Sequence, residues 1–224
     1  MALAIVSTVC FAFIEKILDF LISPILPQIG QVYFFSPADA FVIKIKAALL
    51  AGLVLSSPII LSQAWLFISP ALYPTEKKAV LPLIIITSTL FISGALFSFC
   101  VVLPMTLQFL IGQQTAYLKP MVSMSEYMSF VSGMMLSFGV AFNLPVFILA
   151  LIATGVTTVQ GLNKLQKHAI VIIFIAAAIL TPGPDIASQL TLAVPLLVLF
   201  EVSIVAGWVV EKMFLKRGRT IVKS

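Results

Sequence analysis

Long apolar runs separated by short polar segments dominate the sequence. We expect six of these runs to form membrane-spanning helices, because a helix of about 20 apolar residues crosses the hydrocarbon core of a bilayer. Lipid offers no partner to an unpaired backbone group, which favours helices for such runs. The predicted spans are about 1–22, 41–69, 80–111, 127–154, 169–181 and 186–210.

The predicted spans differ in length. The second, 41–69, is longer than the core is thick and must tilt or project beyond it. The fifth, 169–181, is only about 20 Å long at 1.5 Å per residue, which requires local thinning or shelter by neighbours. The first offers about 21 Å of helix before Glu15, so we expect its cytoplasmic start to be missing or unusually short.

Four of the predicted spans contain an internal proline. Each proline removes one backbone hydrogen bond and bends its helix. Several bent helices favour a curved bundle over a straight one, so we expect a concave, cup-shaped arrangement. These prolines are Pro58, Pro104, Pro145 and Pro195.

The composition supports a membrane protein. Hydrophobic residues make up 61% of the 224 residues and charged residues only 9%, against about 25% charged residues in soluble domains. The mean hydropathy is +1.19. These values exclude a cytosolic enzyme, a nucleic-acid-binding domain and a disordered chain. We therefore predict an all-α polytopic protein with a single membrane domain, 1–224, that ends in a basic cytoplasmic tail, 211–224.

The distribution of basic residues predicts the orientation. Nine Lys and Arg residues lie on the side of the second and fourth predicted connections, 70–79 and 155–168, and of the tail, whereas four lie on the opposite side. Basic residues accumulate on the cytoplasmic side of membrane proteins. Both chain ends are therefore predicted to be cytoplasmic, and the net charge of +5 fits lipid headgroups better than a nucleic-acid partner.

No catalytic or metal-binding pattern is present in the sequence. One histidine, His168, and two distant cysteines, Cys10 and Cys100, are too few ligands for a zinc site and do not suggest a disulfide framework. The known hydrolase, metalloprotease and nucleotide-binding motifs are absent. We expect neither catalysis nor a cofactor, and we expect both thiols to be packing residues.

Polar residues within the predicted spans are the candidates for function, because they are costly in lipid. Glu201 is either a protonated acid bonded to a neighbouring helix, or a partner-helix contact or proton-handling group. Asn143 either pairs with the Ala141 carbonyl region loosened by Pro145 or faces a cavity. Gln63 and Gln189 suit interhelical hydrogen bonds. Glu201, Asn143 and Gln63 would also suit a small secondary transporter or channel, and a purely structural scaffold is a third alternative.

Glu76 lies in the first predicted cytoplasmic connection, next to Lys77 and Lys78. A carboxylate near a helix N-terminus is favoured by the helix dipole, so Glu76 could serve only to start the third span. The alternative is a docking carboxylate for a cationic ligand at the membrane surface.

A series of ordered motifs covers about three quarters of the chain. They are Phe34-Phe35 with Lys44, Ser57-Pro58, Gln63-Ala64-Trp65-Leu66-Phe67, Ser69-Pro70-Ala71-Leu72-Tyr73, Glu76-Lys77-Lys78, Leu90-Phe91, Gly94, Phe97, Pro104, Phe109-Leu110, Phe138-Gly139-Val140-Ala141-Phe142, Leu144-Pro145-Val146, Leu180-Thr181-Pro182, Asp185, Ser188-Gln189, Pro195 and Leu199-Phe200-Glu201. In this order they resemble the TatC family, the multi-spanning core of the twin-arginine protein translocase.

The resemblance implies a six-helix, cup-shaped receptor in the bacterial inner membrane, or less plausibly in an organelle of bacterial descent. It would bind twin-arginine signal peptides of folded proteins, self-associate, and recruit single-span TatA- and TatB-type partners, with transport driven by the proton-motive force. The signal-peptide residues it implies are Glu76, Phe67, Pro70, Leu72, Tyr73 and Asn143. The partner-helix residues it implies are Thr181, Asp185, Gln189 and Glu201.

Two features depart from the family pattern. The fourth-span motif of the family commonly carries a glutamate where this chain has Asn143, and an uncharged amide makes a weaker hydrogen bond to a guanidinium group. The amino-terminal motif His-Leu-x-Glu-Leu-Arg is absent, which indicates a divergent member or a lost start. Both departures bear on the affinity for signal peptides.

Overall fold

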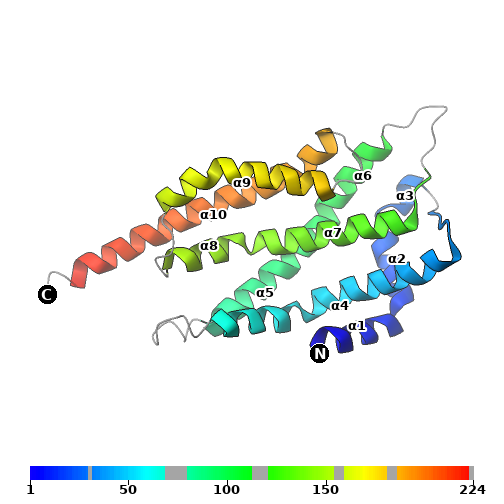
Figure 1. The fold of residues 1–224 in the computed structure, drawn as a ribbon, viewed down its shortest axis with the longest axis horizontal. Coiled ribbons are helices and arrows are strands. Elements are labelled where there is room, and N and C mark those ends of the chain that lie inside the picture. Colours follow the sequence, from blue (N-terminus) through cyan, green and yellow to red (C-terminus); the bar gives the residue numbers. More distant parts are fainter. Residues whose placement is uncertain (30–31, 69–79, 113–120, 154–158, 181–185, 222–224) are drawn as a thin grey trace.

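The computed structural model describes residues 1–29, 32–68, 80–112, 121–153, 159–180 and 186–221 as an elongated helical bundle (Figure 1). Within these ranges the only β-structure is an isolated parallel bridge between Tyr33 and Ser123. The helices are α1 (Ala2–Ala12), α2 (Ile14–Ile22), α3 (Leu26–Ile29), α4 (Pro37–Ile68), α5 (Val80–Phe97), the π-helix η3 (Ser98–Val102), α6 (Leu103–Ile111), α7 (Met124–Phe142), α8 (Leu144–Ala153), α9 (Val159–Leu180) and α10 (Ile186–Ile221).

Five helical stretches of the described chain are long and apolar enough to cross a membrane. They correspond to the second to sixth predicted spans, which confirms an all-α chain with several membrane-length helices. They are Pro37–Leu66, Leu81–Ile111, Met124–Ile152, Gln160–Ile179 and Gln189–Trp208. The six-span cup and the cytoplasmic location of both ends stay predictions.

The first predicted span is divided into two short helices. The helical geometry breaks at Phe13, where φ is −108° and ψ is 22°. Helix α1 packs against the middle of α4, where a Cβ on Gly52 would lie 2.1 Å from the Ser7 Oγ. Helix α2 then continues at a different angle toward α3 (Figure 1), burying Ile14 and Leu21 on one face.

The fifth helix is longer than the apolar run predicted. Helix α9 has 22 residues and begins at Val159, whereas the predicted span began at residue 169. The pattern missed its first turns because they carry Lys164, Lys167 and His168, all of which are exposed. The full helix is long enough to cross the core, so the bilayer thinning expected from a short span is not required.

The internal prolines act in two ways. Pro145 follows a break between α7 and α8 at Asn143, and Pro104 follows the π-helix η3. Pro58 and Pro195 instead lie inside the continuous helices α4 and α10. Only two of the four prolines therefore accompany an interruption of α-helical geometry.

The main core is centred on α7, whose Met128, Met134 and Phe138 are fully buried. Helix α5 approaches it closely because two glycines remove side-chain bulk. A Cβ on Gly94 would lie 2.6 Å from the carbonyl oxygen of Phe138, and a Cβ on Gly139 would lie 2.8 Å from the Phe91 ring. Small residues allow this kind of close helix packing in membranes.

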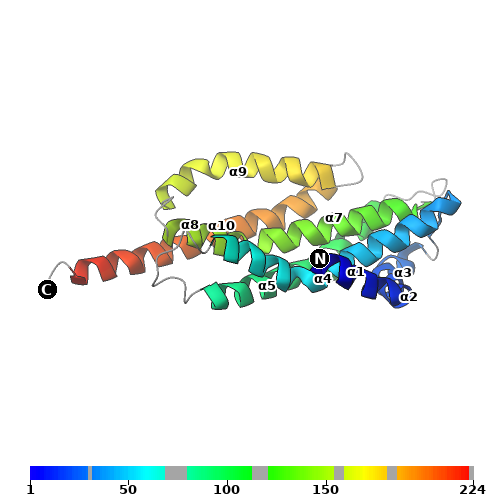
Figure 2. The ribbon, with the colours of Figure 1, turned by 60° about the horizontal axis from the view of Figure 1, so that its bottom comes forward.

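Different helix ends lie at the two ends of the bundle. The end of α4, the start of α5, the end of α8 and the start of α9 lie toward the same end, whereas α3, α6 and the start of α4 lie toward the opposite end (Figure 1). Helix α9 arches over α10 on one side of the molecule (Figure 2). The helix ends that flank the first and second predicted cytoplasmic connections, 70–79 and 155–168, therefore lie on the same side.

Candidate functional site

The main part of the predicted signal-peptide site lies outside the described residues. Glu76, Pro70, Leu72 and Tyr73 fall within 69–79, and Phe67 is described only as part of the last turn of α4. The structure describes the two helix ends that flank this segment: α4 ends at Ile68 and α5 begins at Val80.

Trp65 connects the helices that flank residues 69–79. Its side chain is buried, and its Nε1 donates a 3.1 Å hydrogen bond to Thr87 Oγ1 of α5. Its ring stacks on Phe147 of α8, with ring centroids 6.0 Å apart, and it packs in one cluster with Val146. One indole therefore links α4, α5 and α8 beside the candidate site. In the sequence Trp65 belongs to one of the ordered motifs, but that motif predicts no role for it.

Asn143 lies between α7 and α8 and is 1% exposed. Its Nδ2 donates a 3.0 Å hydrogen bond to the carbonyl of Gly139, so the predicted pairing with a nearby backbone group is present. The partner is Gly139 instead of Ala141. The Oδ1 atom is buried and has no hydrogen-bond partner among the described residues.

Burial of the Asn143 Oδ1 without a hydrogen-bond donor lowers the stability of the fold. Because the Gly139 carbonyl can only accept, it fixes which end of the amide points toward it. A buried acceptor without a donor typically costs about 1–3 kcal/mol. A donor from outside the chain can reach this enclosed atom only if the residues around it move.

The predicted partner-helix residues are only partly described, since Thr181 and Asp185 lie within 181–185. Gln189 is half-buried, and its Nε2 donates a 2.9 Å hydrogen bond to the carbonyl of Phe174 in α9. This bond is the interhelical role predicted for that amide. Gln63, the other amide, is exposed on α4.

Glu201 is exposed on α10 and accepts a hydrogen bond from Gln166 Nε2 of α9. This is the predicted bond to a neighbouring helix. Gln166 could not be predicted as the partner because no sequence motif marks it. Glu201 also lines a shallow groove of about 400 Å³ on the outer face of α10, whose other lining residues are aliphatic: Val194, Leu197, Val198, Val202 and Val205.

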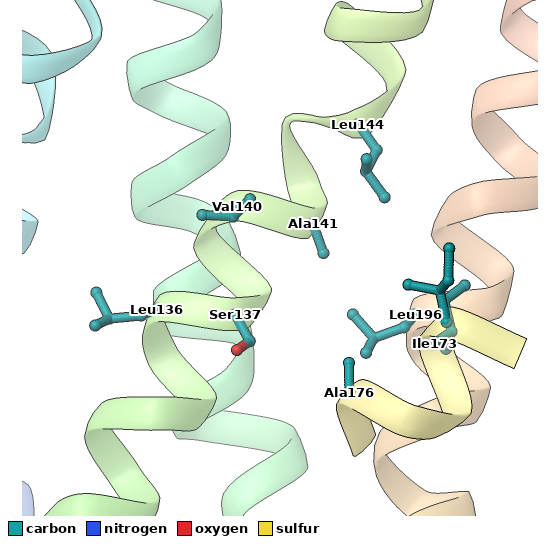
Figure 3. A pocket seen from close by; sticks show the side chains of 9 residues that line it. Leu136, Ser137, Val140, Ala141, Leu144, Ile173, Ala176 and Leu196 are labelled. Carbon is teal, nitrogen blue, oxygen red and sulfur yellow. The ribbon is translucent and has the colours of Figure 1, made fainter. Parts of the chain in front are cut away.

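A second hollow, of about 460 Å³, lies between α7–α8 on one side and α9–α10 on the other. Ser137, Ala141 and Leu144 face Ile173, Ala176 and Leu196 across the gap (Figure 3). All of its described lining residues except Ser137 are aliphatic. Its described lining is therefore almost entirely apolar.

Both cysteines are free; Cys10 is buried and Cys100 is exposed. Within the described ranges, no three side chains of His, Cys, Asp or Glu type come together in a way that would hold a metal ion.

Comparisons with known proteins agree on one family. The model of the Sec-independent protein translocase protein (TatC) matches residues 1–195. The TatC protein of Carboxydothermus hydrogenoformans is 36% identical over 214 residues, covering 95% of this chain and 88% of that protein. The TatC protein of Aquifex aeolicus is 40% identical over 210 residues, covering 92% of this chain and 87% of that protein.

Solved structures are similar over the same extent. A crystal structure described as the twin-arginine translocase receptor TatC superposes with a TM-score of 0.84 at 38% identity. It covers 93% of this chain, and the match spans 92% of that structure. At this identity and coverage both the sequence and the fold are shared, and the chain is a multi-pass membrane protein that belongs to the TatC family of Sec-independent protein translocase proteins.

Proposed function

We propose that this chain is the receptor subunit of a twin-arginine translocase in a bacterial inner membrane. It binds the twin-arginine signal peptides of folded proteins on the cytoplasmic side and recruits single-span TatA- and TatB-type partners. It acts in transport driven by the proton-motive force, without catalysis of its own. The observation that carries this proposal is the match to TatC proteins along nearly the whole chain.

In this proposal Glu76 docks the arginine pair. A guanidinium group forms two parallel, charge-assisted hydrogen bonds with a carboxylate, which makes Glu76 a suitable partner at the membrane surface. Phe67, Pro70, Leu72 and Tyr73 shape the segment around it. The Trp65 link between α4, α5 and α8 supports the proposal, because it holds together the helix ends that flank this segment.

Asn143 contributes a second, weaker contact. Its Oδ1 has no partner among the described residues, and an amide oxygen can accept from a guanidinium group once the side chains that bury it move aside. The bond lacks the charge that the glutamate of the family would supply, so it contributes less to affinity.

The partner helices bind along α9 and α10. Glu201 lies in an aliphatic groove on the outer face of α10, where a polar group of a partner helix can reach it. Gln189, Thr181 and Asp185 complete this contact region near the start of the same helix. The rival interpretation of Glu201, Asn143 and Gln63 as the polar path of a secondary transporter has no support from the comparisons.

The first prediction tests the docking carboxylate. Glu76→Gln should abolish photo-cross-linking of an Arg-Arg signal peptide to residues 69–79. Loss of a hydrogen bond to a charged group costs about 1.5–3 kcal/mol, or roughly 10- to 150-fold in affinity. The measurement is cross-link yield in membrane vesicles, with a Lys-Lys signal peptide as the ligand control.

Glu126→Gln is the matched protein control, because Glu126 is exposed in the first turn of α7, which begins toward the opposite end of the bundle (Figure 1). It should leave the cross-link unchanged. Equal cross-linking by the Glu76→Gln chain and the parent chain would refute the docking role.

A further inference from the structure

The hollow between α7–α8 and α9–α10 lies at the depth of the hydrocarbon core. Its lining residues on α7 and α8 run from Leu136 to Leu144, near the middle of the membrane-length stretch Met124–Ile152. On α9 they are Ile172, Ile173 and Ala176, within the stretch Gln160–Ile179. Whatever fills the hollow therefore does so inside the bilayer.

The hollow is open toward the lipid. Val140 is 58% exposed and Ile172 is 64% exposed at its rim, whereas Ala141 and Leu196 at its floor are buried. Helix α9, which forms one wall, is the least buried of the five membrane-length stretches. A chain from the surrounding bilayer can enter from the side without displacing a helix.

Water does not suit this space. A buried water requires about two to four polar partners, and Ser137 is the only polar residue among the described lining residues. An empty space is also unfavourable, because wall atoms without neighbours lose their dispersion contacts. An apolar occupant is therefore required.

The length of the hollow suits a single acyl chain. The lining from Leu136 to Leu144 extends about 12 Å along α7 and α8. One acyl chain reaches about 15 Å, half the thickness of the hydrocarbon core, so it is long enough to lie along this lining.

Basic residues lie where the headgroup of such a lipid would sit. Lys164 and His168 are exposed on the first turns of α9, on the i, i+4 stripe that continues to Ile172 and Ala176, about 12 and 6 Å along the helix from Ile172. Helix α9 contains no acidic residue, and the carboxylate of Glu201 on the neighbouring helix is bonded to Gln166. Long basic side chains extend along a helix toward the interface and attract anionic headgroups.

We propose that this hollow binds one acyl chain of an anionic phospholipid from the leaflet at the start of α9, with its headgroup held by Lys164 and His168. The bound lipid fills the wall between α7 and α9 and holds α9 in its place. This binding is independent of the signal-peptide site, so each can fail without the other.

The test uses the purified full-length chain incubated in detergent with phosphatidylglycerol or with phosphatidylcholine of the same acyl chains. Native mass spectrometry counts the lipids that stay bound. The parent chain should retain one phosphatidylglycerol and retain phosphatidylcholine about tenfold less. Lys164→Gln combined with His168→Gln should remove this preference.

Ala176→Phe should reduce lipid retention at least about tenfold by filling the hollow. Ile175→Phe is its matched control, because Ile175 is 55% exposed and is not among the lining residues, so it should retain lipid like the parent chain. Ser137→Phe fills the space from the α7 wall and serves as the second filling variant if Ala176→Phe fails to elute as a folded protein. Undiminished retention by a folded filling variant, or equal retention of the two lipids by the parent chain, would overturn the proposal.

Discussion

At the scale of single residues, the structure shows a different environment for each of the two amide atoms of Asn143. The sequence marked it as an amide beside a proline, where the family commonly has glutamate. The structure adds that its Nδ2 bonds to Gly139 and that its Oδ1 has no partner within the described chain. One side chain thus both closes the break between α7 and α8 and leaves one acceptor unused.

Replacement of this amide by a carboxylate should strengthen signal binding. Asn143→Glu is expected to tighten binding of an Arg-Arg signal peptide, because a charged acceptor makes a stronger hydrogen bond to a guanidinium group. It should also lower stability by about 1–3 kcal/mol, since a carboxylate cannot donate to the Gly139 carbonyl. Peptide affinity and thermal unfolding in detergent measure the two effects.

Asn143→Gln is the control for this change, because it has the length of glutamate without the charge. It should not tighten binding. If the glutamate and glutamine variants bind the signal peptide alike, the position does not face the arginine pair.

At the scale of helices, the close approach of α5 and α7 depends on Gly94. A Cβ there would lie 2.6 Å from the Phe138 carbonyl oxygen and 2.8 Å from the Phe142 Cβ, and the backbone oxygen cannot move aside as a flexible side chain would. Phe97 of α5 contacts the rings of both Phe138 and Phe142. The glycine and the aromatic cluster therefore form one tightly packed interface.

Enlargement of this glycine should separate the two helices. Gly94→Leu is expected to destabilise the chain by at least about 1–3 kcal/mol, the usual cost of overpacking. Thermal unfolding followed by size-exclusion chromatography measures the effect. Ser93→Val, at an exposed position on the same helix, is the control and should change stability little. A Gly94→Leu chain as stable as the parent would mean that α5 and α7 do not pack this closely in the membrane.

At the scale of the whole molecule, aromatic residues occupy both ends of the bundle. Tyr33, Phe34, Phe35 and Phe41 are exposed near the start of α4. At the other end, the exposed Trp208 of α10 lies under Lys212, whose Nζ is 4.7 Å from the ring centroid. Aromatic and basic side chains of this kind collect at membrane interfaces, which supports a transmembrane orientation along the long axis.

This orientation predicts which positions face the outside. In a chain with Cys10→Ala and Cys100→Ala, a cysteine introduced at Ser36 should react with a membrane-impermeant maleimide in intact cells. A cysteine at Gln160, at the start of α9, should react only after the membrane is opened. The reverse pattern would invert the orientation predicted from the basic residues.

The site could be predicted only in part. Glu201 and Gln189 were identified because a polar residue in an apolar run stands out, and their interhelical hydrogen bonds are those expected of such residues. Gln166 and Trp65 were missed, since the partner of a polar group on another helix depends on how the helices pack. The residues around Glu76 lie outside the described ranges, and their role remains a prediction.

The sequence alone determined the helical class, the second to sixth hydrophobic segments and the family, because the length of an apolar run and the order of its motifs are properties of the linear chain. Tertiary structure decided where geometry changes within those segments: the break at Phe13, the π-helix before Pro104 and the early start of α9. It also decided that α9 leaves a hollow beside α7. Apolar residues are stable in contact with lipid on every side of a helix, so hydrophobicity predicts that a helix forms. Contacts between helices decide where the helix bends and which of its faces is buried.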